Sequence, residues 1–192
     1  MRGGWRQPTW RPDRLAGVLV VIAALATVTG STPRSSLVPG NDLCKVIGRP
    51  LLRTLLPDAG PARSWRRPGL PPAAVCDVRS RTGSSALSVI LVRLDLARAR
   101  QILRSRCSRY SSKADSYYGP ESEVRAIGDE GCRYYIHDGR TPVATGVVTV
   151  RKGNLLITVS FTTRTVGAHN TAVQTAVGSG EAVASYVLGR IS

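Results

Sequence analysis

The chain has 192 residues, of which 42% are hydrophobic, and it carries 27 Lys and Arg against 12 Asp and Glu, a formal charge of +15. This length and apolar content predict one domain with extensions. Aromatic residues make up only 5% of the chain, which argues against stacking platforms for single-stranded nucleic acid. One long apolar run excludes a membrane protein with several spans.

The N-terminal segment, 1–30, has the layout of an export signal. Residues 1–14 contain four arginines and one aspartate, and an uncharged apolar run over 15–30 follows them. This run is shorter than the roughly 20 residues of a comfortable membrane span, so a cleaved signal peptide and an uncleaved single-span anchor both remain open. A buried core helix is the third alternative. In both leading interpretations the arginines stay in the cytoplasm and the rest of the chain is extracytoplasmic.

The exported part begins with a linker and short helical pieces. Residues 31–41 are rich in Ser, Thr, Pro and Gly and predict a linker, so residues 42–192 form the predicted domain. Asp42 can cap a helix that Gly48 ends, and a second helical piece covers 51–56. Residues 57–73 hold five prolines and predict a basic surface loop. Three arginines lie in this loop: Arg63, Arg66 and Arg67.

The middle of the domain predicts two strands and a helix. Residues 74–80 alternate weakly, whereas 86–94 are apolar on both alternating faces, as expected for a central strand. Asp95 can cap a helix over 96–108. The apolar stripe of this helix is Leu96, Ala99 and Leu103. Residues 111–123 are polar and predict a loop.

The second half of the domain predicts hairpins and a final helix. Strands over 132–137 and 143–151 flank the turn dipeptide Asp138-Gly139. Residues 155–163 show the clearest two-residue alternation in the chain, and 170–191 have helical spacing. Strands that are grouped into hairpins favour an α+β fold, in which an antiparallel sheet packs against helices.

Four cysteines predict a disulfide framework. None forms a Cys-x-x-Cys pair, which disfavours zinc knuckles and thioredoxin-like motifs. An even number of widely spaced cysteines in an exported chain is typical of disulfides, and three connectivities are possible. We prefer Cys44 with Cys76 and Cys107 with Cys132, because each bond would tie a helix to a nearby strand. Four buried free thiols are the alternative.

Several short motifs resemble a family of actinobacterial secreted and lipoprotein domains of unknown function. Over residues 41–191 they are Asp42-Leu43-Cys44, Cys76-Asp77-Val78, 86–89, 128–131, 151–154 and 187–191. The resemblance implies an envelope location, an α+β fold and no established chemistry, and it supplies no catalytic residues. Members of the family often carry a lipobox. No lipobox ends the apolar run of this chain, so no lipid anchor is expected.

No catalytic motif is evident in the sequence. A hydrolase could use His137 as a general base near Ser88 or Ser160, whereas a solvent-facing histidine at a strand end is the simpler interpretation. The hydrolase motifs Gly-x-Ser-x-Gly, Ser-x-x-Lys and His-Glu-x-x-His do not occur. Asp129 and Glu130 are adjacent but have no further acids at ligand spacing, so they predict a polar turn rather than a metal site. We expect neither a metal nor a cofactor.

The basic charge is the strongest functional signal. Loss of the segment 1–30 would leave a formal charge of +12, and 24 of the 27 basic residues are Arg, which pairs bidentately with phosphate and carboxylate. The alternative is a solvated basic surface without a ligand. The candidate anion-binding residues are Arg63, Arg66, Arg67, Arg98 and Arg104.

Together these features predict a non-enzymatic protein of the cell envelope, either secreted or anchored to the membrane by residues 15–30. Its expected partner is an anionic envelope polymer, a lipid headgroup or another envelope protein. An extracellular hydrolase with a site assembled from distant residues is the alternative function. Nucleic acid fits the charge but conflicts with export and with the scarcity of aromatic residues.

Overall fold

The computed structural model describes residues 42–67, 73–108, 117–118, 122–124, 126–137, 143–164 and 169–191. The predicted export segment, the linker and the turn at Asp138-Gly139 lie outside these residues. Within the described ranges, no helix is both long enough and apolar enough to cross a membrane.

Three helices and eight strands follow one another along the described chain. They are α2 (Leu43–Leu55), β1 (Arg63–Arg67), β2 (Ala73–Arg79), β3 (Ser85–Arg93), α3 (Leu96–Ser108), β4 (Tyr117–Tyr118), β5 (Ser122–Glu123), β6 (Glu130–His137), β7 (Val143–Lys152), β8 (Leu155–Arg164) and α4 (His169–Ile191). The predicted α+β fold class is confirmed.

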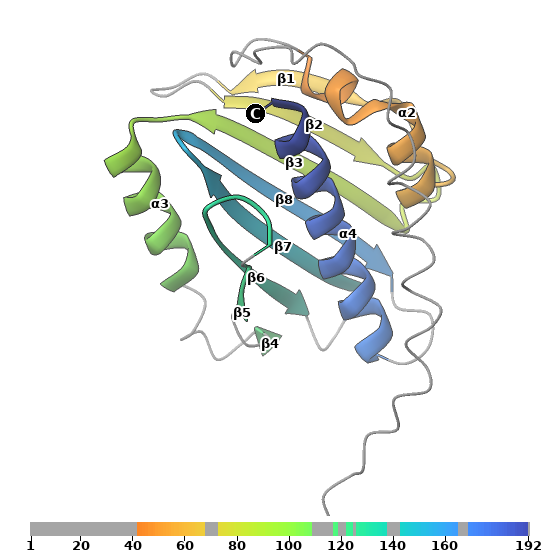
Figure 1. Cartoon of the computed structure of the whole chain (residues 1–192). Coiled ribbons are helices and arrows are strands. Elements are labelled where there is room, and N and C mark those ends of the chain that lie inside the picture. The colour runs from red at the N-terminus through yellow and green to blue at the C-terminus, as the bar shows by residue number, and fades with distance from the viewer. Residues whose placement is uncertain are drawn as a thin grey trace, which may run out of the picture. The chain divides into compact units, whose positions relative to one another are not determined.

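The described strands form one antiparallel sheet (Figure 1). Its order is β1-β2-β3-β8-β7-β6-β4, and β5 also pairs with β6. Sequence neighbours pair as hairpins, which is the predicted arrangement. The pairing of β3 with β8 is different, because it joins the two halves of the chain at the centre of the sheet. The prediction that β3 is a central strand is therefore confirmed.

The two faces of the sheet carry different cores, because side chains alternate along each strand. The main core lies on one face, where α2 and α4 pack against side chains such as Val89, Val148 and Ile157. Figure 1 shows α4 crossing this face. On the opposite face, α3 covers Leu156 in a smaller apolar cluster. This helix contacts β6, β7 and β8.

The beginning of α2 follows the sequence closely. The Asp42 carboxylate caps it by accepting hydrogen bonds from the backbone N–H groups of Cys44, at 3.1 Å, and Lys45, at 3.3 Å. Gly48 has φ +75° and ψ 151°, so α2 is kinked there, and Pro50 begins its second part. The two predicted helical pieces are thus the two halves of α2.

Both preferred disulfides are present in the structure. Cys44–Cys76 joins α2 to β2, and Cys107–Cys132 joins α3 to β6. Each bond ties a helix to a strand, as predicted, and the two bonds act on opposite faces of the sheet. The alternative of four free thiols does not hold, because every cysteine of the chain is paired.

Three local predictions were wrong. The Pro-rich segment predicted as a loop contains β1, because an edge strand tolerates prolines just outside its paired residues. The polar loop over 111–123 contains the two-residue strands β4 and β5, which pair with the edge of β6. Leu96, predicted to be part of the apolar stripe, is the first residue of α3 and is 45% exposed, whereas Ala99 and Leu103 are buried.

Helix α4 approaches β7 very closely at Gly146. A Cβ atom built at Gly146 would overlap the backbone of Ala176 and Val177. Gly180 lies on the same side of α4, where a Cβ would be 3.0 Å from the side chain of Val148. Only glycine at position 146 therefore lets the helix lie this close to the sheet.

The variant Gly146→Ala should lower the free energy of unfolding by about 2 kcal/mol or more, because its methyl group must push α4 off the sheet. The same substitution at Gly178, an exposed position of α4 with open space around it, should leave stability unchanged or raise it by up to about 1 kcal/mol. Denaturant unfolding of both variants measures the difference. Equal effects would contradict the close contact at position 146.

Candidate functional site

A groove of about 750 Å³ lies over β1, β2, β3 and β8. Its size is in the usual range of ligand sites. Its floor includes Asp77, Ser88 and Ser160, which are register partners on three adjacent strands. By strand alternation this row belongs to the face opposite α4, in the part that α3 does not cover.

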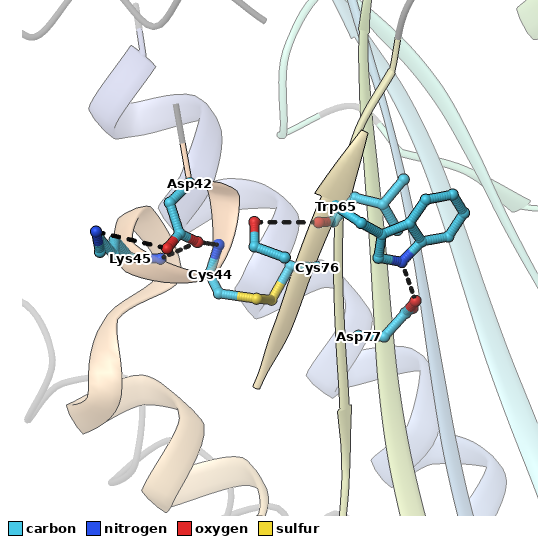
Figure 2. The surroundings of a disulfide bond; sticks show 8 residues. Asp42, Cys44, Lys45, Trp65, Cys76 and Asp77 are labelled. Atoms are coloured by element: carbon cyan, nitrogen blue, oxygen red, sulfur yellow. Dashed lines mark hydrogen bonds and ion pairs between the residues drawn. A yellow bond between two sulfur atoms is a disulfide. The ribbon is translucent and has the colours of Figure 1, made fainter. Parts of the chain in front are cut away.

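Trp65 forms one wall of the groove. Its indole is 46% exposed, and its Nε1–H donates a hydrogen bond of 2.8 Å to Oδ2 of Asp77. Figure 2 shows the indole and Asp77 on one side of the strand pair, and the Cys44–Cys76 disulfide on the other. The arrangement follows from alternation along β2, because Cys76 and Asp77 are neighbours and point to opposite faces.

Three exposed arginines give the groove its charge. In the described part of the chain, Arg63, Arg79 and Arg81 line it together with a single carboxylate, that of Asp77. Among the described residues, no carboxylate lies within ion-pair distance of these three guanidinium groups. Arg63 and Arg79 can therefore bind an incoming phosphate or carboxylate without first breaking an ion pair, whereas Arg81 already interacts electrostatically with the Asp58 carboxylate and lowers its pKa.

A hydrogen-bonded network holds one end of the groove. Thr82 donates to the Asp58 carboxylate through its hydroxyl, at 2.7 Å, and through its backbone N–H, at 3.3 Å. The backbone N–H of Gly60 donates to the carbonyl of Arg79 at 2.8 Å. The Thr82 hydroxyl holds the pKa of Asp58 below its ordinary value of 3.8. These bonds tie the segment after α2 to the turn between β2 and β3, which carries Arg81.

The structure separates the arginines that the sequence grouped as anion-binding candidates. Arg63 lines the groove. Arg66 and Arg67 follow it in β1, but their side chains lie outside the described part of the structure. Arg98 and Arg104 are exposed on α3 and are not part of the lining. Of the five candidate arginines, only Arg63 is among the described residues that line the groove.

Sequence reasoning missed Trp65, Asp77, Arg79 and Arg81. A signal for the last three was present, because they are spaced by two residues and so can share one side of an extended segment. The same spacing joins Trp65 to Arg63. This spacing of Arg63 and Trp65 did not lead to a prediction, because residues 57–73 were predicted to be a loop. In a loop, residues two positions apart do not have to share a face.

Other arginines have structural roles. Arg151 is 3% exposed, and its guanidinium donates to Asp129 Oδ2 at 2.8 Å, to Glu130 Oε1 at 3.1 Å and to the carbonyl of Gly153. On α3, Arg106 donates to the hydroxyl of Thr158 at 2.7 Å. These contacts join strands, a turn and a helix. Asp129 and Glu130 thus both form ion pairs with the buried Arg151.

The strand register bears on the histidine and serine candidates. Both lie on strands that pair with β7: His137 of β6 is the register partner of Ala144, and Ser160 of β8 is the register partner of Val147. Positions 144 and 147 are an odd number of residues apart, so they belong to opposite faces of the sheet. The register does not bring position 137 to the row of Ser88 and Ser160, and the His137 side chain lies outside the described part of the structure.

Comparison with protein-family models and with curated proteins finds no match to this chain. What the groove can do is therefore argued from its geometry. Cationic side chains surround a floor of hydroxyl groups and one carboxylate, and an exposed indole lies beside them. This arrangement can bind an anionic, hydrogen-bonding ligand.

Replacement of Thr82 by Val should raise the pKa of Asp58 toward 3.8, because the strongest hydrogen bond to the carboxylate is lost. The stabilisation from that bond is present above pH 3.8 and disappears as the pH falls through the lower pKa of the folded state. An NMR titration of the carboxyl carbon measures the pKa. Thr82→Ser keeps the hydroxyl and should keep the lowered pKa; a raised pKa in this control would contradict the assignment.

Proposed function

We propose that this chain is an extracytoplasmic, non-enzymatic binding domain whose groove holds an anionic polymer of the cell envelope. The observation that carries the proposal is the set of three exposed arginines that line the groove, Arg63, Arg79 and Arg81, of which Arg63 and Arg79 have no acidic partner among the described residues. Outside a cell, polymers with phosphate or uronate groups are the abundant anions with which arginine pairs. The net positive charge of the whole chain would attract such polymers from a distance.

The location is supported by independent features. The two disulfides are consistent with an extracytoplasmic location, because such bonds persist in oxidising compartments. The arginine-flanked apolar run over residues 15–30 has the layout of a signal peptide or anchor. The resemblance to actinobacterial secreted and lipoprotein domains agrees with both.

A polymer fits this surface better than a lipid headgroup or a protein partner. Among the described residues, the exposed large hydrophobic side chains are Trp65 and Leu96, one on β1 and one at the start of α3. Membrane-binding surfaces and protein interfaces both use contiguous apolar area, which these two separate residues do not provide. A groove lined by arginines, hydroxyl groups and one described carboxylate instead suits a hydrated anionic chain.

The hydrolase alternative has less support. The titratable side chains in the described lining are three arginines and Asp77, and one oxygen of that carboxylate already accepts from Trp65. Acid–base hydrolysis needs a second group that can exchange a proton near neutral pH. A polymer that stays at full length during incubation with the protein would support binding without hydrolysis.

The intact mass of the protein from its native envelope fraction tests export. After alkylation without reduction, we expect no modified thiol, because both disulfides are formed. A mass from which the export segment is missing would identify a cleaved signal peptide, and a full-length mass an anchor. Four alkylated thiols without reduction would contradict the extracytoplasmic location.

The double variant Arg63→Ala/Arg79→Ala should bind an oligogalacturonate at least tenfold more weakly than the wild type, because each charge-assisted hydrogen bond contributes about 1.5 kcal/mol or more. The salt dependence of binding should also become shallower, because fewer counterions are released. Isothermal titration calorimetry at two salt concentrations measures both effects.

The matched control is Arg98→Ala/Arg104→Ala, which removes the same charge from α3, outside the groove. It should weaken binding by less than threefold. An equal loss in both double variants would show that overall charge, rather than the groove, attracts the polymer.

A further inference from the structure

Trp65 is exposed in a way that argues for a particular ligand. It lies on the edge strand β1 with 46% of its surface accessible, although the polar edge of its ring is already satisfied by Asp77. The hydrogen bond at 2.8 Å holds the indole in one orientation beside the groove. A ring held in this way offers an apolar face at low entropic cost, because it is ordered before any ligand arrives.

The floor of the groove has hydrogen-bonding groups that the described residues leave without a partner. Asp77, Ser88 and Ser160 follow one another across β2, β3 and β8, and neighbouring strands are about 4.8 Å apart, so the row is about 10 Å long. Neither serine hydroxyl makes a hydrogen bond within the described residues, and the carboxylate accepts only from Trp65. A ligand that both donates and accepts along this row would satisfy all three side chains.

The carboxylate of Asp77 decides between kinds of anion. A ligand that is anionic along its whole length, such as polyphosphate, would place negative charge against this carboxylate. Like charges in contact repel each other. A ligand with hydroxyl groups at the floor and acidic groups only at the rim avoids that repulsion. Its acidic groups would then reach Arg63 and Arg79, which line the groove.

We propose that the groove binds an acidic glycan, with one sugar ring stacked on Trp65, sugar hydroxyls on the row Asp77–Ser88–Ser160, and its carboxylate or phosphate groups on Arg63 and Arg79. The C–H face of a sugar covers the exposed indole, as apolar ligand surfaces cover aromatic rings. This inference rests on the proposed function and adds the chemical class of the polymer.

The fluorescence of Trp65 can report whether a ligand is bound against its indole. The chain has three tryptophans, Trp5, Trp10 and Trp65. The full-length variant Trp5→Phe/Trp10→Phe therefore keeps Trp65 as its only indole. Titration of this variant with an oligogalacturonate should change the intensity and the wavelength of its fluorescence, whereas linear polyphosphate of equal charge should change them little.

A second comparison tests the contribution of the ring. Trp65→Ala should weaken oligogalacturonate binding at least tenfold but polyphosphate binding less than twofold. Trp65→Phe should give an intermediate loss, because it keeps a smaller aromatic face and loses the bond to Asp77. The control Leu96→Ala removes the other exposed large hydrophobic side chain of the described residues and should change neither affinity.

The outcomes separate this inference from the proposed function. If polyphosphate binds as tightly as oligogalacturonate and Trp65→Ala affects both equally, the glycan inference is overturned while anion binding in the groove stands. If a neutral malto-oligosaccharide binds as tightly as the uronate, charge does not decide binding, and both the inference and the anionic ligand of the proposed function are overturned. If none of the three probes binds, the proposed function itself fails.

Discussion

The packing of α4 against the centre of the sheet is the contact on which the rest of the structure depends. It buries Val183 and Val187 over Val148 and Ile157, and it is close because position 146 has no side chain. One helix thereby fills most of one face of the sheet, with α2 completing it. The opposite face needs only α3 over β6, β7 and β8, so the remaining strands are left open to form the groove.

The Cys44–Cys76 disulfide supports the groove from the opposite face of the sheet. Cys44–Cys76 joins α2 to β2 one residue before Asp77, so the strand that carries the carboxylate is held from behind (Figure 2). The hydrogen bond from Trp65 to that carboxylate then transmits the same order to the edge strand β1. Binding groups supported by a second layer of fixed contacts lose little entropy when a ligand arrives.

Two physical classes can be distinguished among the arginines. Arg106 and Arg151 are tied into the fold, because each donates to a partner on another element. Arg63, Arg79 and Arg81 face solvent over the groove and have no ion pair among the described residues. Composition alone cannot distinguish these classes. All the charges of the chain contribute to the field that attracts an anionic ligand, but only exposed arginines of the groove can contact that ligand directly.

Several local features of the chain were determined by the sequence itself. The cap at Asp42, the break at Gly48 and the alternation along β8 depend on residues a few positions apart, and the structure has them as predicted. The groove depends on the pairing of β3 with β8, which brings Ser160 beside Ser88 although the two serines lie in opposite halves of the domain sequence. Only the tertiary structure decided this pairing. It joins residues that are far apart in the sequence, and its register depends on the burial of a whole face of the sheet.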